Sequence, residues 1–230
     1  PVFYFPKFFH PDPTVERQSG FLTPEINDSN VLGSSLTQPY FKVISKDKDY
    51  TFSPTVFDSD IISLQNEFRQ ANENSNFIAD FGFVNGYKNN NRSHIFAKYN
   101  LNLDLSEFDT SELSFGLEQV SNDTYLKVFN TYISNSEARP QNLNVMNNKI
   151  KLVLNHQDYN FTSGFEAYET LDINKNSDRY EYVLPYYTFD TVLKEKIFDG
   201  SLSLNSSGNN TLNNTNKLNS SVTNNLNYTS

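Results

Sequence analysis

The sequence predicts an all-β fold, in which about eleven strands follow one another as an antiparallel meander. From about Ser34 onward, segments of roughly nine to twelve residues alternate apolar and polar side chains, which is the period of a strand with two different faces. Short polar connections separate these segments, and their Asn, Asp, Ser and Gly residues are typical of turns. No segment keeps the 3.6-residue period of a helix over a useful length.

The clearest segments indicate which face each side chain takes. In FIADFGFVNGY the residues expected on one face are Phe77, Ala79, Phe81, Phe83 and Tyr87, and those on the other are Asp80, Gly82 and Gly86. HIFAKYNLNLDL, from His94 to Leu105, repeats the pattern, as do shorter segments at 113–117, 150–154 and 159–167. The last segment runs from Leu218 to Tyr228. We therefore expect one apolar and one polar face over most of the sheet.

Two architectures produce such a sheet. A soluble β-sandwich favours strands of about five or six residues, whereas a strand that crosses a membrane needs roughly nine to eleven. The segment lengths favour a large transmembrane β-barrel with a polar lumen, and Tyr87, Tyr159 and Tyr186 near segment ends suit the aromatic girdles of such barrels. A soluble sheet with one solvated face stays open on these grounds.

Composition excludes several classes of protein. The net charge of −9 disfavours a nucleic-acid surface, which needs clustered Lys and Arg. The chain has no cysteine and therefore no disulfide framework or thiolate metal site of its own. The sequence starts in the middle of an aromatic pattern, at PVFYFPKFF, and has no long apolar run. We expect a fragment of a longer protein without a transmembrane helix.

Residues that could carry catalysis are scattered. His10, His94 and His156 lack the spacing of a metal site, and the two later ones occupy polar-face positions where we expect solvated or lumen-facing side chains. The carboxylates that could form an acid–base pair are Asp158, Glu166 and Glu169. Because the chain has 27 acidic residues, such proximity is expected by chance. We predict that the protein is not an enzyme and uses no metal or other cofactor.

Prolines interrupt the pattern early in the chain. The stretch HPDPTVERQSGFLTP, from His10 to Pro24, contains three prolines directly before the first candidate strands. Further prolines lie in or beside candidate strands at Pro39, Pro54 and Pro185. Each proline removes one ladder donor, so these residues either end strands and protect an edge, or mark a seam that can part.

The same stretch carries a resemblance to a known family. FYFPKFFHPDPTVERQSGFLTP, followed by LTQPYFKVIS, resembles the junction between jellyroll and barrel in the LPS-assembly outer-membrane proteins, the LptD family. The matching residues are Arg17, Ser19, Gly20, Phe21, Leu22, Pro24, Pro39 and Tyr40. Later segments resemble family landmarks in the same order: LQNEFRQ, VSNDTYLKVF, FEAYETLD and YEYVLPYYTF. One departure is Glu16, where the family often has a basic residue.

The resemblance implies a path for lipopolysaccharide into the outer leaflet of the outer membrane, through a laterally gated barrel. Residues 1–17 would be the end of a periplasmic jellyroll and its linker, and residues 18–230 the N-terminal part of the barrel. Pro24 and Pro39 would weaken the lateral gate. Pro11, Pro13, Arg17, Ser19, Gly20 and Phe21 would form the domain junction. Lipopolysaccharide, the plug lipoprotein LptE and the periplasmic bridge protein LptA are the partners implied, with the N-terminal residues in the periplasm.

Other functions remain open from the residues alone. A different outer-membrane channel or receptor, such as a porin, would also need long alternating strands. A soluble secreted β-sandwich that binds glycans would need only one solvated face. A β-rich hydrolase is disfavoured because no convergent triad or metal set is visible.

Overall fold

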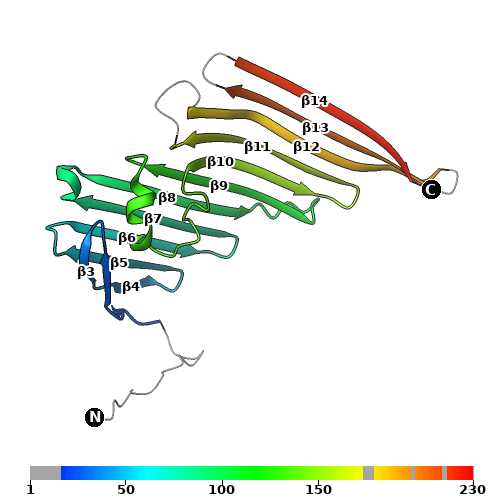
Figure 1. Cartoon of the computed structure of the whole chain (residues 1–230). Helices are drawn as coiled ribbons and strands as arrows, with labels where there is room; N and C mark the ends of the chain where they lie inside the picture. Colours follow the sequence, from blue (N-terminus) through cyan, green and yellow to red (C-terminus); the bar gives the residue numbers. More distant parts are fainter. Residues whose placement is uncertain (1–16, 173–178, 198–199, 214–216, 230) are drawn as a thin grey trace, which may run out of the picture.

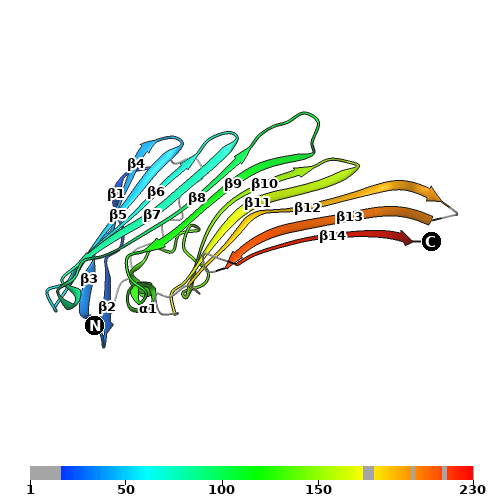
Figure 2. The ribbon, with the colours of Figure 1, turned by 90° about the horizontal axis from the view of Figure 1, so that it is seen from above.

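The computed structural model describes residues 17–172, 179–197, 200–213 and 217–229. These residues form one 14-stranded sheet in which neighbouring strands are antiparallel and mostly consecutive in the chain (Figure 1). The prediction of an all-β antiparallel meander is confirmed. Seen from above, the strands follow one another along a curved surface from β1 to β14 (Figure 2). The closed barrel stays a prediction.

The first strands are short and the later ones long. The short strands are β1 (Gly20–Phe21), β2 (Glu25–Ser29), β3 (Gly33–Thr37) and β4 (Tyr40–Ser45). The long strands are β5 (Lys48–Phe57), β6 (Ile62–Ala71), β7 (Ser75–Asn85), β8 (Arg92–Asn102), β9 (Thr110–Val120), β10 (Val145–Asn155), β11 (Tyr159–Thr170), β12 (Tyr180–Ile197), β13 (Gly200–Asn213) and β14 (Lys217–Thr229). From β5 to β11 each strand has 10 to 12 residues, close to the predicted lengths.

Side chains alternate between two faces, as predicted. One face, called here the apolar face, carries large exposed side chains in cross-strand register: Phe81, Ile95 and Gln119 in one row and, two rows on, Phe115, Ile150 and Phe165. Phe81, Ile95, Phe115, Ile150 and Phe165 each expose 39–49% of their surface. The other face, called the polar face, carries Asp80, His94 and Lys98 from β7 and β8. An exposed apolar surface of this extent is typical of a surface that contacts another protein or a membrane.

The connection between β9 and β10 packs on the polar face. We call residues 121–144 the internal segment; it contains helix α1 (Tyr125–Phe129) and the 3₁₀ turn η2 (Asn130–Tyr132). Figure 1 shows α1 lying over the middle strands, and the hydrophobic core lies between α1 and the sheet. The buried residues of this core are Leu32, Phe57, Ile61, Val84, Tyr87, Phe96, Tyr125, Leu126, Phe129, Ile133, Ala138, Met146 and Leu171. The sequence pattern did not predict α1, because one and a half turns are too short to show a helical period.

Two of the three predicted girdle tyrosines lie elsewhere. Tyr87 is in the 3₁₀ turn η1 (Tyr87–Asn89) and is buried against Phe129, with ring centroids 5.3 Å apart. Tyr186 lies in cross-strand register with Gly164, on the polar face. Tyr159 is in step with Phe161 on the apolar face and packs 5.9 Å from Phe189. The girdle prediction is wrong for Tyr87 because the internal segment supplies a closer apolar surface.

Gly82 offers a test of how closely the polar face is packed. A Cβ at this position would lie 2.3 Å from Gln65 Oε1 and 2.5 Å from His94 Cε1, and both side chains are buried. We expect Gly82→Ala to lower the free energy of unfolding by about 1–3 kcal/mol, because the neighbours cannot move without losing their own packing. The midpoint of urea unfolding in detergent measures this change. Gly20→Ala is the control, since nothing lies within 4 Å of its added Cβ. Equal midpoints for the two variants would contradict the packing described here.

Candidate functional site

The chain crosses the sheet first as β1 and β2 and then, in the opposite direction, as β3 and β4. We call these the first and the second pass, and each of them is interrupted. β1 and β2 are separated by residues 22–24, and β3 and β4 by residues 38–39. β4 and β3 pair with successive stretches of β5, and the register is unchanged across residues 38–39, with Tyr40 opposite Phe52 and Thr37 opposite Thr55. The second pass is therefore one straight strand that loses its regular ladder over two residues. The interruptions contain Pro24 and Pro39, the two residues predicted to form a seam.

The two interruptions are unequal in length and form a bulge. Phe21 faces Tyr40 and Glu25 faces Thr37, so three residues of the first pass oppose two of the second. An extra residue reverses the alternation of a strand. As a result Phe21 and Ile26, which are five residues apart, both reach the apolar face, where they are 76% and 82% exposed. The bulge keeps an apolar surface on both sides of Pro24.

A third proline continues the row. Because Thr37 faces Thr55 and Tyr40 faces Phe52, Pro54 on β5 lies opposite Gln38, directly beside Pro39. We call Pro24, Pro39 and Pro54 the proline row. The row contributes three carbonyls but no amide protons. Two of these carbonyls are used: Pro39 O accepts from Leu22 N (2.9 Å), and Pro54 O accepts from Gln38 N (3.1 Å).

A glutamine side chain bridges part of the gap. Gln38 Nε2 donates to Leu22 O (2.9 Å) and lies 3.3 Å from Pro39 O. This contact replaces a ladder bond with one from an amide side chain that can rotate away. The first edge of the sheet is therefore held near the proline row by fewer backbone bonds than a regular antiparallel pair would supply.

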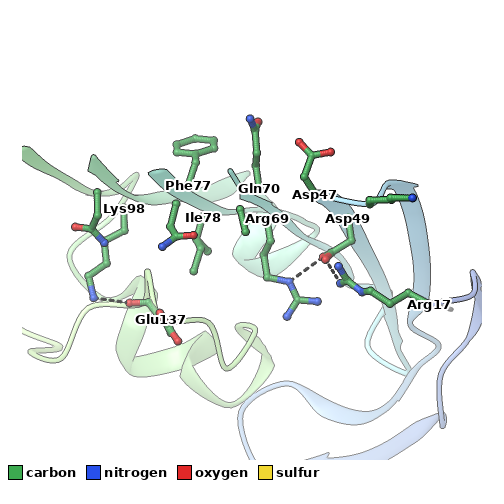
Figure 3. A pocket seen from close by; sticks show the side chains of 13 residues that line it. Arg17, Asp47, Asp49, Arg69, Gln70, Phe77, Ile78, Lys98 and Glu137 are labelled. Atoms are coloured by element: carbon green, nitrogen blue, oxygen red, sulfur yellow. Dashed lines mark hydrogen bonds and ion pairs between the residues drawn. The ribbon is translucent and has the colours of Figure 1, made fainter. Parts of the chain in front are cut away.

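Arg17 is tied to the sheet just before β1. Its guanidinium donates to the buried carboxylate of Asp49 on β5, and Arg69 Nε on β6 donates to the other oxygen of the same carboxylate (2.8 Å; Figure 3). Arg17 also lies over the Phe41 ring, 5.5 Å from its centroid. The three charged side chains join the start of the described chain to β5 and β6. The sequence singled out Arg17 but not Asp49, because Asp49 belongs to a short polar stretch that was interpreted as a turn.

The Arg17 cluster lines an open cavity of about 450 Å³ on the polar face (Figure 3). Lys98 closes its far side and donates to the backbone carbonyl of Glu137 in the internal segment (2.9 Å). At its rim the Ser45 hydroxyl donates to Asp47 (2.6 Å), and this hydrogen bond lowers the pKa of the Asp47 carboxyl. Cations and carboxylates alternate around the cavity, so it has no strong preference for one sign of charge.

The other predicted junction residues do not form one cluster, and each has its own contacts. Ser19 Oγ accepts a hydrogen bond from Val43 N (2.9 Å), which extends the β1–β4 pairing by one step. Phe21 packs edge-on against Tyr40, with centroids 5.1 Å apart. Gly20 pairs with Phe41 without a left-handed backbone, so the structure gives no local reason for glycine there. Pro11 and Pro13 lie outside the described residues, as does His10.

His94 lies on the polar face, as predicted for a solvated or lumen-facing side chain, but it is buried rather than solvated. Its Nε2 lies 2.9 Å from Asp80 Oδ1, and its Nδ1 lies 2.8 Å from the hydroxyl of Tyr125 in α1. All three side chains are inaccessible, and burial raises the pKa of the Tyr125 hydroxyl, which therefore stays protonated. Alternation predicts that Asp80 and His94 share a face, but nothing in the sequence predicts that Tyr125 covers them. This set fixes the start of the internal segment to β7 and β8.

A second clamp fixes the far end of the polar face. Arg179, before β12, donates to both oxygens of Asp123 (2.6 and 2.9 Å) and to Glu169 Oε1 (2.6 Å). The hydrogen bond to Asp123 is the main reason why the pKa of Arg179 is raised. Glu169 is thus occupied by Arg179, Glu166 contacts Tyr168, and Asp158 is exposed in the turn before β11. The three acids proposed as a possible acid–base pair do not meet.

Within the described ranges, no group of three His, Cys, Asp or Glu side chains could hold a metal ion. The same part of the chain contains no helix that is long and apolar enough to cross a membrane. The most organised features of the described residues are an edge interrupted by prolines, an anchored start and an internal segment packed on the polar face.

Comparison with curated proteins gives a consistent result. LPS-assembly protein LptD of Polaromonas is 41% identical over 69 residues, which cover 30% of this chain and 8% of that protein. LptD of Legionella pneumophila is 26% identical over 193 residues, covering 74% of the chain and 22% of the relative. LptD of Pseudoalteromonas atlantica is 27% identical over 128 residues.

The chain is similar to LPS-assembly protein LptD.

The extent of the similarity is limited. The chain spans 8% to 22% of the length of these LptD relatives. No family model matches the chain. The resemblance to the LptD family seen in the sequence is confirmed, and what the whole of an LptD protein does can be carried to this chain only as a proposal.

The Arg17 anchor leads to a prediction about Asp49. Asp49→Asn keeps the shape of the side chain but removes the charge that two arginines share, while both arginines stay half-exposed. We expect a loss of about 1–3 kcal/mol in the free energy of unfolding, and faster proteolytic cleavage near residue 17. Urea unfolding and timed digestion measure the two effects. Asp47→Asn is the matched control in the neighbouring turn. Unchanged cleavage near residue 17 in Asp49→Asn would contradict the anchor.

Proposed function

We propose that the chain forms part of the wall of an outer-membrane β-barrel that transports lipopolysaccharide and inserts it into the outer leaflet. The observation that carries the proposal is the similarity to LPS-assembly proteins along 74% of the chain, in a sheet whose strands from β5 onward are long. Transport of this kind needs a path and a gate rather than catalytic groups, so we propose that the protein is not an enzyme.

The two faces of the sheet suit a membrane wall. Strands of 10 to 12 residues reach roughly 34–40 Å at about 3.4 Å per residue, enough to cross the hydrocarbon core when tilted. The exposed Phe, Ile and Leu side chains of the apolar face would contact lipid. The Asp, Asn, Ser and Lys side chains of the polar face would line water. A soluble glycan-binding sandwich is disfavoured, because it would leave the apolar face in water.

The start of the chain supports the proposed domain division. We propose that residues 1–17 end a periplasmic jellyroll and its linker, and that residues 18–230 belong to the barrel. Arg17 stands at this boundary and is held by Asp49 and Phe41. An anchor at this point would keep the exit of the jellyroll aligned with the polar face. By family resemblance, the bridge protein LptA would deliver lipopolysaccharide from the periplasm, and the lipoprotein LptE would plug the barrel.

The seam proposal rests on the proline row. β1 pairs with β4 over two residues, and the described strands leave the outer side of β1 and β2 as an edge. In lipid, unpaired backbone groups are costly, so this edge would pair with a closing strand. Pro24 lies on that edge and offers it no donor, and Pro39 removes a donor between the first and second passes, because its carbonyl faces Leu22; each lost bond is worth roughly 0.5–1.5 kcal/mol net. A seam weakened in this way could part without unfolding the rest of the wall.

The test is to restore the missing donors. We expect Pro24→Ala combined with Pro39→Ala to strengthen the seam and lower the amount of lipopolysaccharide at the cell surface. Surface labelling of lipopolysaccharide, with the amount of folded protein measured in the same cells, gives the result.

The matched control is Thr23→Ala combined with Ser53→Ala, at neighbouring positions that already carry an amide proton. Normal export in the proline double variant would refute the seam assignment. Normal export after depletion of the protein itself would refute the proposed function.

A further inference from the structure

The β2–β3 hairpin stands apart from the rest of the sheet. The proline row separates it from β1 and β4, so that the hairpin and the β1–β4 pair are two blocks of one edge. Among the described strands, β2 pairs with β3 alone, and β3 reaches β5 through three residue pairs. In comparison, β6 and β7 are paired at ten positions. The attachment of the hairpin to the wall is short, and it borders directly on the row.

Few contacts hold the hairpin against β5. The hydroxyls of Thr37 and Thr55 are 2.7 Å apart and buried on the polar face. Asp58 N donates to Ser34 O (3.0 Å), and Ser59 Oγ donates to Leu32 O (2.6 Å). These contacts are polar and local, so each could be exchanged for water if the hairpin moved.

The internal segment supplies the remaining attachment. Tyr132 packs edge-on against Phe57, with centroids 4.9 Å apart, and its hydroxyl lies 3.5 Å from Ser35 Oγ on β3. Leu32, in the turn of the hairpin, is fully buried in the core that also contains Phe129 and Ile133. The internal segment is itself fixed to β7 and β8 by the Tyr125–His94–Asp80 set. The internal segment therefore connects the hairpin to β7 and β8, two strands that carry no residue of the proline row.

A polar cavity remains between the hairpin and the internal segment. It measures about 330 Å³, and Asn27, Thr37 and Ser53 line it from the sheet, with Asn135 and Arg139 opposite. The hairpin is thus not packed against the internal segment over its whole length. A rotation about the proline row would open this cavity to the edge of the sheet without breaking the pairing of β4 with β5.

We propose that the β2–β3 hairpin is a flap hinged on the proline row, and that the internal segment is the latch that holds it closed through Tyr132 and Leu32. Pro54 is the third hinge residue, because Gln38 hydrogen-bonds to its carbonyl and Pro54 offers no amide in return. Tyr132 is a positioning residue that acts through β3. The role of the flap in export rests on the proposed function, but its hinged motion does not.

A reversible crosslink tests the flap. Thr37→Cys with Thr55→Cys places two thiols at opposed positions whose hydroxyls are now 2.7 Å apart, a geometry that a disulfide fits. The chain has no cysteine of its own, so the new pair can be assigned without ambiguity. In the full protein in its own cells, we expect the oxidised pair to block most lipopolysaccharide export and a reductant to restore it.

The control pair is Thr162→Cys with Thr188→Cys, two threonines that face each other across β11 and β12 on the same polar face. Its oxidation should leave export unchanged. Full export by the oxidised flap pair would overturn the flap. If the Pro24→Ala, Pro39→Ala double variant still exports less lipopolysaccharide in the same assay, the transport proposal stands without the flap.

The latch can be tested without measuring lipopolysaccharide export. Thr37 is buried, so a single Thr37→Cys should react slowly with a membrane-impermeant maleimide. Adding Tyr132→Ala should raise this rate several-fold, and Tyr132→Phe, which keeps the ring against Phe57 but loses the hydroxyl contact with Ser35, should raise it less. Rates in both variants equal to that of Thr37→Cys alone would overturn the latch.

Discussion

The pairing of backbone amides and carbonyls is the constraint on which this structure depends. A sheet that crosses lipid has no water to satisfy its backbone, so each strand needs a complete ladder to its neighbours. From β5 to β11 the chain meets this requirement with long strands in continuous antiparallel register, and the next register shift, at Gly164, lies between β11 and β12. The first edge departs from it at one level, where three prolines lie side by side. The regular strands from β5 to β11 therefore support the first edge, where the ladder is interrupted.

The internal segment explains how an edge with few ladder bonds can stay closed. It covers the polar face with a small apolar core, and it reaches from β7 and β8 to the hairpin beside the proline row. Buried polar groups make this possible. His94 is held between a carboxylate and a hydroxyl, and Arg179 between two acids, so that neither leaves an unpaired donor under the segment. A path on the polar face would run beside these groups.

Much of the fold could be predicted from the sequence, because alternation is a local signal. Phe77, Phe81 and Ile150 lie on the face to which their period assigned them, and β7 and β14 begin within two residues of the predicted segments. Pro24 and Pro39 interrupt the ladder at the strands expected to carry them. The proline-rich stretch before residue 17 lies outside the described residues, so the expected link between two β domains stays a prediction.

The features that sequence reasoning missed all depend on contacts between distant residues. Asp49 became important only because Arg17 and Arg69 converge on it, and Tyr125 only because α1 folds back onto His94. Pro54 looked like an ordinary strand-edge proline until the register placed it beside Pro39. Period and composition contain no information about such pairings, which are set by the register of the sheet and the course of the internal segment.

Hydrogen exchange of the full-length protein in lipid tests the central claim most directly, because it reports how well each amide is held in the ladder. The account predicts that the amides of Leu36, Thr37, Gln38 and Tyr40, around the proline row, exchange markedly faster than those in the middle of β7 and β8. Equal protection across these strands would contradict it, because the proline row would then not be the weakest line in the wall.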